Sequence, residues 1–154
     1  MNDGAERGFT LLEMVCVLAI IALLAAVLLP FIPRETSRAR LQAYALQTAT
    51  LLKADRVAAI SRQTSVATLV DAGARAIHSG ARPDSIRIPD DVRFDAVLPQ
   101  TCRRQAALST ISFFANGMSC GGTIALTRLD TGFEIRVNWL TGRIEIVPHD
   151  TSAN

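Results

Sequence analysis

The pattern of hydrophobic and polar residues changes along the chain and divides it into distinct stretches. Residues 14–29 carry no charged or strongly polar side chain, and a short polar leader precedes them. Extended to Phe9 and Ile32, this run supplies roughly the 20 residues that a helix needs to cross a bilayer. The pattern predicts a transmembrane helix over residues 9–33, joined to one folded domain.

Residues 34–63 predict an amphipathic continuation of this helix outside the membrane, after a kink at Pro30 and Pro33. Apolar side chains recur there at the three- and four-residue spacing of one helix face, which we expect to cover a sheet. That face consists of Leu41, Tyr44, Ala45, Thr48, Leu51, Leu52 and Val57. The polar face is most simply a solvated surface, or one that contacts neighbours in a filament, and it includes Arg38, Gln42, Lys53 and Arg56.

Residues 64–148 predict a β-rich globular domain, because short alternating runs are separated by turn residues. The weaker runs are 65–70, 75–79, 86–88 and 93–98, and the firmer ones are 111–114, 122–128, 133–138 and 143–147. The residues expected to face inward in the last three runs are Ile124 and Leu126, then Phe133, Ile135, Val137 and Trp139, then Ile144 and Ile146. A long helix on such an antiparallel sheet is an α+β fold, and residues 149–154 read as a polar tail.

Length and charge narrow the class of protein. The 154 residues allow one domain and an anchor. The formal net charge of +2 rises to +3 without residues 1–8, which leaves 15 basic against 12 acidic side chains. This balance is too weak to indicate nucleic acid or an acidic substrate as a partner.

The N-terminus resembles the prepilin (type IV pilin-like) signal. The leader ends at Gly8, Phe9-Thr10-Leu11-Leu12-Glu13 follows, and the apolar helix comes next. The resemblance implies that a prepilin peptidase cleaves between Gly8 and Phe9, removes residues 1–8 and methylates the new amino group of Phe9. An ordinary secretory signal differs, because it has a basic leader and is cut after its apolar core.

Glu13 is the one carboxylate inside the apolar run. A charge there costs on the order of 2.5 to 3.5 kcal/mol toward the membrane centre and less near the edge. Either Glu13 is hydrated at headgroup level, or it has a partner. The family resemblance implies the second, in which Glu13 pairs with the N-terminal ammonium of a neighbouring subunit during filament assembly.

The chain from residue 111 to residue 147 is similar to the C-terminal region of the GspH/FimT pseudopilins. The features that carry the similarity are Gly121-Gly122, which opens a strand, and the hairpin Trp139-Leu140-Thr141-Gly142-Arg143. We expect Trp139 to serve as core or hairpin cover rather than as a ligand platform. The resemblance implies a pilin-like fold and a minor pseudopilin of type II secretion that helps assemble the pseudopilus tip and export folded proteins.

Two signals disagree about topology. Arg34, Arg38 and Arg40 follow the apolar run and only Arg7 precedes it, so the positive-inside rule alone places the domain in the cytoplasm. The prepilin signal implies the opposite and takes precedence. We therefore expect a single-pass inner-membrane protein with a cytoplasmic N-terminus and a periplasmic domain.

Residues 117–121 satisfy the G-x-S-x-G pattern of serine hydrolases, with Ser119 followed by Asp130 and His149 in the expected order. The context is wrong, because a nucleophile elbow precedes a helix and residues 123–128 alternate like a strand. We expect hairpin turns here and no enzymatic activity.

The cysteines and histidines indicate no cofactor. Cys102 and Cys120 lie in the expected periplasmic domain, where they either form a disulfide or stay too far apart, and the sequence leaves both open. Cys16 reads as a small apolar residue of the anchor. His78 and His149 lack neighbours at metal-ligand spacing, so no metal site is expected.

The sequence therefore predicts a minor pseudopilin whose partners are other pseudopilins, the prepilin peptidase, the inner-membrane assembly platform and, before assembly, lipid. The alternatives are a FimT-like minor pilin of type IV pili that acts in pilus assembly or DNA uptake, and a membrane-anchored periplasmic binding module. DNA binding would need a clustered basic stripe, and the tail after Ile146 has no Lys or Arg, so no nucleic acid is expected.

Overall fold

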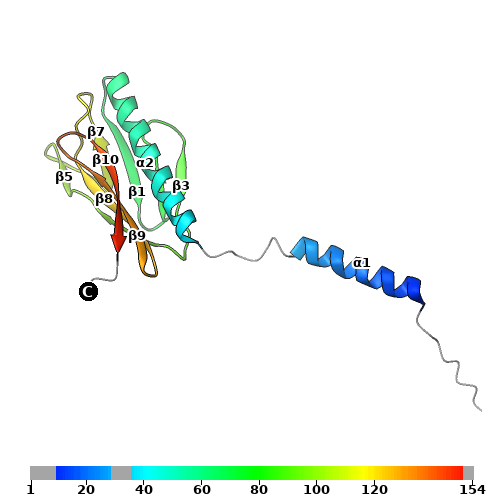
Figure 1. Cartoon of the computed structure of the whole chain (residues 1–154). Coiled ribbons are helices and arrows are strands. Elements are labelled where there is room, and N and C mark those ends of the chain that lie inside the picture. The colour runs from blue at the N-terminus through cyan, green and yellow to red at the C-terminus, as the bar shows by residue number, and fades with distance from the viewer. Residues whose placement is uncertain (1–9, 29–35, 151–154) are drawn as a thin grey trace, which may run out of the picture. The chain divides into compact units, whose positions relative to one another are not determined.

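The computed structural model describes residues 10–28 and 36–150, and the chain divides into two compact units, one up to Glu35 and one from Thr36 onward. The first unit contains helix α1 (Leu11–Leu28), and the second contains helix α2 (Arg38–Ser61) and the strands (Figure 1). Gly8, Phe9, Pro30 and Pro33 lie outside the described residues, and so does the predicted kink.

Helix α2 starts four residues later than predicted, because Ser37 is extended and caps it. The Ser37 hydroxyl accepts a hydrogen bond from the Arg40 N–H at 3.3 Å, which satisfies one of the free donors of the first turn. The helix ends at Ser61, and the Arg62 N–H still bonds to the Ala58 carbonyl. Most of the predicted apolar face is buried as expected, but Val57 is 61% exposed.

The strands form two four-stranded antiparallel sheets and a small hairpin. The first sheet has the order β3-β2-β1-β7, with β1 (Val66–Asp71), β2 (Ala76–His78), β3 (Ser85–Arg87) and β7 (Thr110–Phe113). The second has the order β10-β9-β8-β4, with β4 (Arg93–Val97), β8 (Gly122–Arg128), β9 (Thr131–Val137) and β10 (Ile144–Asp150). The hairpin pairs β5 (Thr101–Cys102) with β6 (Gln105–Ala106).

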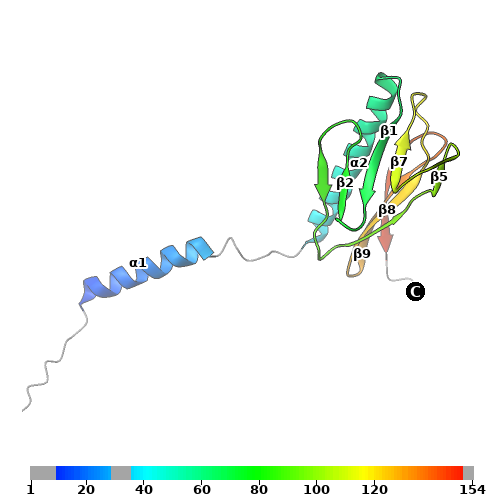
Figure 2. The same cartoon turned by 180° about the vertical axis from the view of Figure 1, so that it is seen from behind.

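The core lies between α2 and the inner faces of both sheets. Alternation places Val66, Thr68 and Val70 of β1 inward, and all three are buried. In the second sheet, Ile124, Leu126 and Ile135 are fully buried. Figure 2 views the molecule from behind Figure 1 and shows β1, β2 and β7 on the side of α2 that faces away in Figure 1.

The structure corrects three predictions about the last third of the chain. Strand β7 belongs to the first sheet with β1, while the earlier strand β4 pairs with β8. Trp139 is no core residue, since it lies past the end of β9 and its side chain is 63% exposed. His149 lies in β10 opposite Gly132 rather than in a polar tail.

Two neighbouring residues of α2 attach the helix to different parts of the domain. Asp55 is fully buried and accepts hydrogen bonds from the Thr68 hydroxyl of β1 at 2.6 Å and from the Gly80 N–H at 3.0 Å. Arg56 is half-buried and donates to the carbonyls of Gly117 and Thr141, each at 3.0 Å. The helix is therefore fixed against the first sheet by a carboxylate and against the turns beside the second sheet by a guanidinium.

Candidate functional site

The assembly residue predicted from the sequence lies at the start of α1. The Thr10 hydroxyl accepts a hydrogen bond from the Glu13 N–H at 3.3 Å, and Thr10 thereby caps the helix. Glu13 is an exposed carboxylate in the first helical turn, where the helix dipole favours a negative charge. Within the part of the chain that the structure describes, no cation pairs with Glu13.

Apart from Glu13, helix α1 is apolar around its whole circumference. Side chains that point in every direction are exposed, among them Leu12 at 75%, Leu18 at 65% and Leu23 at 67%. Such a helix is stable only when lipid or other protein covers it. Among the described residues, no helix combines the length and the hydropathy needed to cross a bilayer. The predicted anchor at residues 9–33 also includes residues 9 and 29–33, which lie outside the described part.

An ionic cluster holds the first residue of the globular unit. Asp91 accepts hydrogen bonds from the backbone N–H of Thr36 at 2.6 Å and from its hydroxyl at 2.9 Å, and it pairs with Arg128 at 3.1 Å. The bond from the Thr36 N–H is the main reason why the pKa of Asp91 lies below its ordinary value. The cluster thus fixes the point from which α2 begins, and no local pattern in the sequence indicates it.

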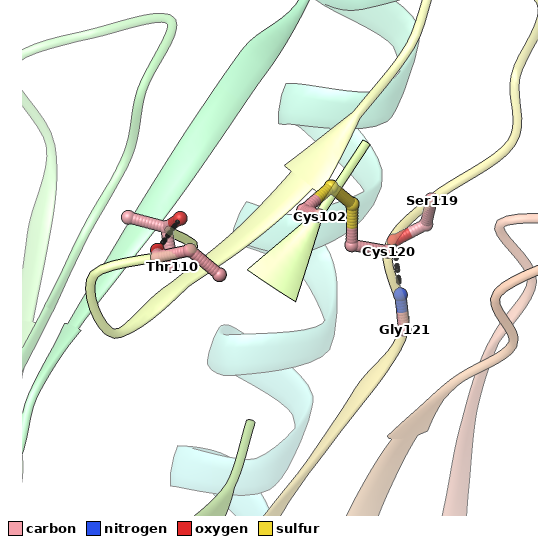
Figure 3. Close-up of a disulfide and its surroundings, with 6 residues drawn as sticks. Cys102, Thr110, Ser119, Cys120 and Gly121 are labelled. Atoms are coloured by element: carbon pink, nitrogen blue, oxygen red, sulfur yellow. Dashed lines mark hydrogen bonds between the residues drawn. A yellow bond between two sulfur atoms is a disulfide. The ribbon is translucent and has the colours of Figure 1, made fainter. Parts of the chain in front are cut away.

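Cys102 and Cys120 form a disulfide, with their Cα atoms 5.7 Å apart, the normal spacing for such a bridge. Figure 3 shows that the bridge connects β5 to the segment that leads into β8. In that segment Ser119 accepts a hydrogen bond from the Gly121 N–H at 3.0 Å. Cys16 is an exposed free thiol on α1.

The three residues of the hydrolase-like pattern do not form a catalytic group. Ser119 precedes β8 and Asp130 follows it, and seven strand residues at roughly 3.3 Å each separate the two ends. His149 pairs with Gly132, at the Asp130 end. The Ser119 side chain is buried, and a strand rather than a helix follows it. The described residues also contain no cluster of three or more His, Cys, Asp or Glu side chains placed to hold a metal ion.

The residues that sequence reasoning missed are charged groups with tertiary partners. No local pattern in the sequence singles out Asp55 or Asp91, and Arg56 was assigned to a polar face that is solvated or contacts neighbours in a filament. Arg56 contacts two glycine-containing turns, at Gly117 and Gly142, whose φ angles of 81° and 63° lie in the left-handed region. The two Asn/Thr-Gly pairs were a signal for turns, but not for the side chain that they hold.

Residues 4–29 match the prokaryotic N-terminal methylation motif, which indicates an inner-membrane-anchored pilin-like protein. Two solved structures share the fold. The minor pilin FimU of Pseudomonas aeruginosa has a TM-score of 0.56 at 19% identity, over 73% of this chain and 92% of that one. The minor pseudopilin EpsH of the Vibrio cholerae type 2 secretion system has a TM-score of 0.55 at 10% identity, over 70% of this chain and 95% of that one.

A relative that is similar over nearly all of this chain shows the family. The type II secretion system protein H of Xanthomonas campestris pv. campestris is 32% identical over 152 residues, which cover 96% of this chain and 86% of that protein. The similarity therefore includes the N-terminal motif, both helices and the two sheets. The chain belongs to the type II secretion system protein H family and is a non-enzymatic, pilin-like minor pseudopilin.

Proposed function

We propose that this protein is an inner-membrane precursor that is processed at Gly8/Phe9 and then incorporated into the pseudopilus of a type II secretion system, where it helps assemble the tip and export folded proteins. The observation that carries the proposal is the N-terminal methylation motif at residues 4–29, which includes Glu13 in the first turn of an uncovered apolar helix. Residues 9–33 serve as the anchor, with a kink at Pro30 and Pro33.

Glu13 acts in assembly by pairing with the methylated amino group of Phe9 on a neighbouring subunit. Each of these charges is costly in hydrocarbon by itself, and pairing removes much of that cost only when subunits stack. The prepilin peptidase, the other pseudopilins and the inner-membrane platform are the partners of these steps. The globular unit lies in the periplasm, an oxidising compartment in which the Cys102–Cys120 bridge persists.

The mature N-terminus tests this function. The full chain is expressed in a bacterial host with and without a prepilin peptidase, and the N-terminus is determined by mass spectrometry. We expect a methylated Phe9 terminus only with the peptidase. Gly8→Val should block cleavage, while the matched leader variant Gly4→Val should not. An intact Met1 terminus in every sample contradicts the proposal.

Two further measurements examine the individual roles. Glu13→Gln keeps the shape of the side chain, so it should leave cleavage intact and prevent incorporation into filaments sheared from cells. Protease added to spheroplasts should digest the globular unit. If the domain is protected until the membrane is dissolved, the orientation is the one given by the positive-inside rule instead.

A FimT-like minor pilin of type IV pili is the second candidate, because FimU shares the fold to the same degree as EpsH. Both of these structures are less than 20% identical to this chain, so they do not favour the type II secretion system over the type IV pilus system or the reverse. The relative at 32% identity favours secretion. Deletion of the gene should abolish export of secreted enzymes and leave twitching motility and DNA uptake unchanged, whereas the reverse result would establish the pilus system.

A further inference from the structure

A groove of about 690 Å³ lies between α2 and the turn that joins β9 to β10. We call it the α2–hairpin groove, and its lining residues are Lys53, Arg56, Val57, Thr141, Gly142, Arg143 and Ile144. Three of these side chains are basic, and none of the described lining residues is acidic. The groove therefore presents a concentrated positive charge on a protein whose overall charge is close to neutral.

Arg56 is the fixed centre of this groove. Its Nε and Nη2 atoms donate to the carbonyls of Gly117 and Thr141, which are neutral acceptors. A side chain at Gly142 would lie 2.7 Å from Arg56 Nε, so the close approach requires glycine there. No carboxylate pairs with Arg56 among residues 10–28 and 36–150. The guanidinium is thus held in place while its charge remains uncompensated.

The charged side chains around Arg56 do not neutralise its positive charge. Lys53 is exposed and forms no hydrogen bond or ion pair within the described residues. Arg143 pairs with Glu145 at 2.8 Å, and Arg136, which lies opposite Glu145 on β9, pairs with Glu134 at 2.8 Å. The surplus of positive charge in the groove therefore comes from Lys53 and Arg56, which have no carboxylate partner among the described residues.

Exposed apolar side chains border the same surface. Val57 lines the groove and is 61% exposed, and the adjacent turn carries Trp139 at 63% and Leu140 at 54%. Fixed arginines and exposed aromatic side chains are the residue types that dominate the binding energy of protein interfaces. We propose that the α2–hairpin groove binds an acidic segment of another pseudopilin, in which Asp or Glu side chains contact Lys53, Arg56 and Arg143 and an apolar side chain contacts Trp139 and Leu140.

An acidic protein segment fits this surface better than the other anionic ligands do. A chain terminus brings a single carboxylate, whereas three basic side chains line the groove. A nucleic acid backbone offers no apolar side chain for Leu140, whereas a protein segment can present one beside its carboxylates. The proposal rests on the proposed function, because the partner is a subunit of the same pseudopilus.

The test is co-purification of the full, tagged chain with each of the other pseudopilins of its own secretion system, co-expressed one at a time with prepilin peptidase and extracted in mild detergent. The double variant Lys53→Glu/Arg143→Glu should reduce recovery of one pseudopilin by about tenfold or more. The control Arg87→Glu/Arg104→Glu makes the same change in net charge at exposed residues on β3 and the β5–β6 turn, and it should leave recovery unchanged. Substitution of Lys for the matching Asp or Glu of the partner should restore binding.

Each result decides the proposal. Equal recovery with the groove variant and the control overturns it, as does a wild-type chain that recovers no pseudopilin. Retention of a fluorescent 20-base-pair DNA duplex that is lost in the groove variant, without any change in pseudopilin recovery, also overturns it. The mature N-terminus of the same samples distinguishes the two proposals. A methylated Phe9 terminus with equal recovery by the groove variant and the control overturns only the groove proposal. An intact Met1 terminus with recovery that depends on Lys53 and Arg143 overturns only the processing proposal. Thermal melting by circular dichroism checks that the variants are folded.

Discussion

Replacing Asp55 with alanine tests whether a buried carboxylate holds α2 on the first sheet. The two carboxylate oxygens accept hydrogen bonds from the Thr68 and Ser79 hydroxyls and from the N–H groups of Gly80 and Ala81. Asp55→Ala leaves the fully buried Thr68 hydroxyl without this acceptor and removes three further hydrogen bonds, from Ser79, Gly80 and Ala81. An orphaned buried group costs about 1–3 kcal/mol and each other lost hydrogen bond about 1 kcal/mol, so the free energy of unfolding should fall by on the order of 3–5 kcal/mol.

Denaturant unfolding of the full chain in detergent, followed by far-UV circular dichroism, measures this loss. Trp139 is the single tryptophan and is largely exposed, so its fluorescence is a poor reporter of unfolding. Thr68→Val keeps the shape of its side chain and removes one donor, which should cost about 1 kcal/mol. Asp84→Ala is the matched control, since Asp84 is exposed and forms a surface ion pair with Arg82, and it should cost less than about 1 kcal/mol. If Asp55→Ala costs no more than Asp84→Ala, the carboxylate does not hold the helix.

Three further predictions concern the remaining fixed points of the domain. Because hydrogen bonds from Thr36 lower the pKa of Asp91, its stabilising effect is present at neutral pH and is lost as the pH falls through that lowered pKa. Between about pH 7 and pH 3, the melting temperature should therefore fall less for Asp91→Asn than for wild type, and parallel curves would contradict this. Gly142→Ala places a methyl group 2.1 Å from the Gly117 carbonyl at a φ of 63°, so it should cost about 2 kcal/mol or more in unfolding free energy, whereas Gly73→Ala, in an open turn, should cost less. Cys102→Ser/Cys120→Ser opens a loop that spans 18 positions and should cost about 3 kcal/mol under oxidising conditions, with no difference from wild type once both are reduced.

Local patterns predicted the elements well. The alternation in β1 assigned Val66, Thr68 and Val70 to one face, and the helical spacing assigned Leu41, Ala45 and Leu52 to another, and all of these side chains are buried. Such patterns depend only on the period of a helix or a strand, which neighbouring residues reveal. They did not show that Trp139 lies beyond the end of β9 in an exposed turn, because alternation continues past the last paired residue.

Local patterns could not predict which strands pair with one another. β7 and β8 are neighbours in the chain and were expected in one sheet, yet the segment between them crosses from the first sheet to the second. There the Ser119 N–H bonds to the Trp139 carbonyl and the Cys120 N–H to the Ser112 carbonyl. Nothing in the composition of either strand distinguishes the two sheets, since both bury one apolar face.

The sequence by itself determined the apolar N-terminal helix with Glu13 near its start, the amphipathic second helix, the β-rich domain and the family resemblance at both ends, because each is written in contiguous residues. Only the tertiary structure decided which charged residues have partners. Asp55, Arg56 and Asp91 contact groups between 13 and 85 positions away, and a single sequence holds no record of such proximity. The same contacts leave the charge of Arg56 uncompensated in the α2–hairpin groove, where a second protein can reach it.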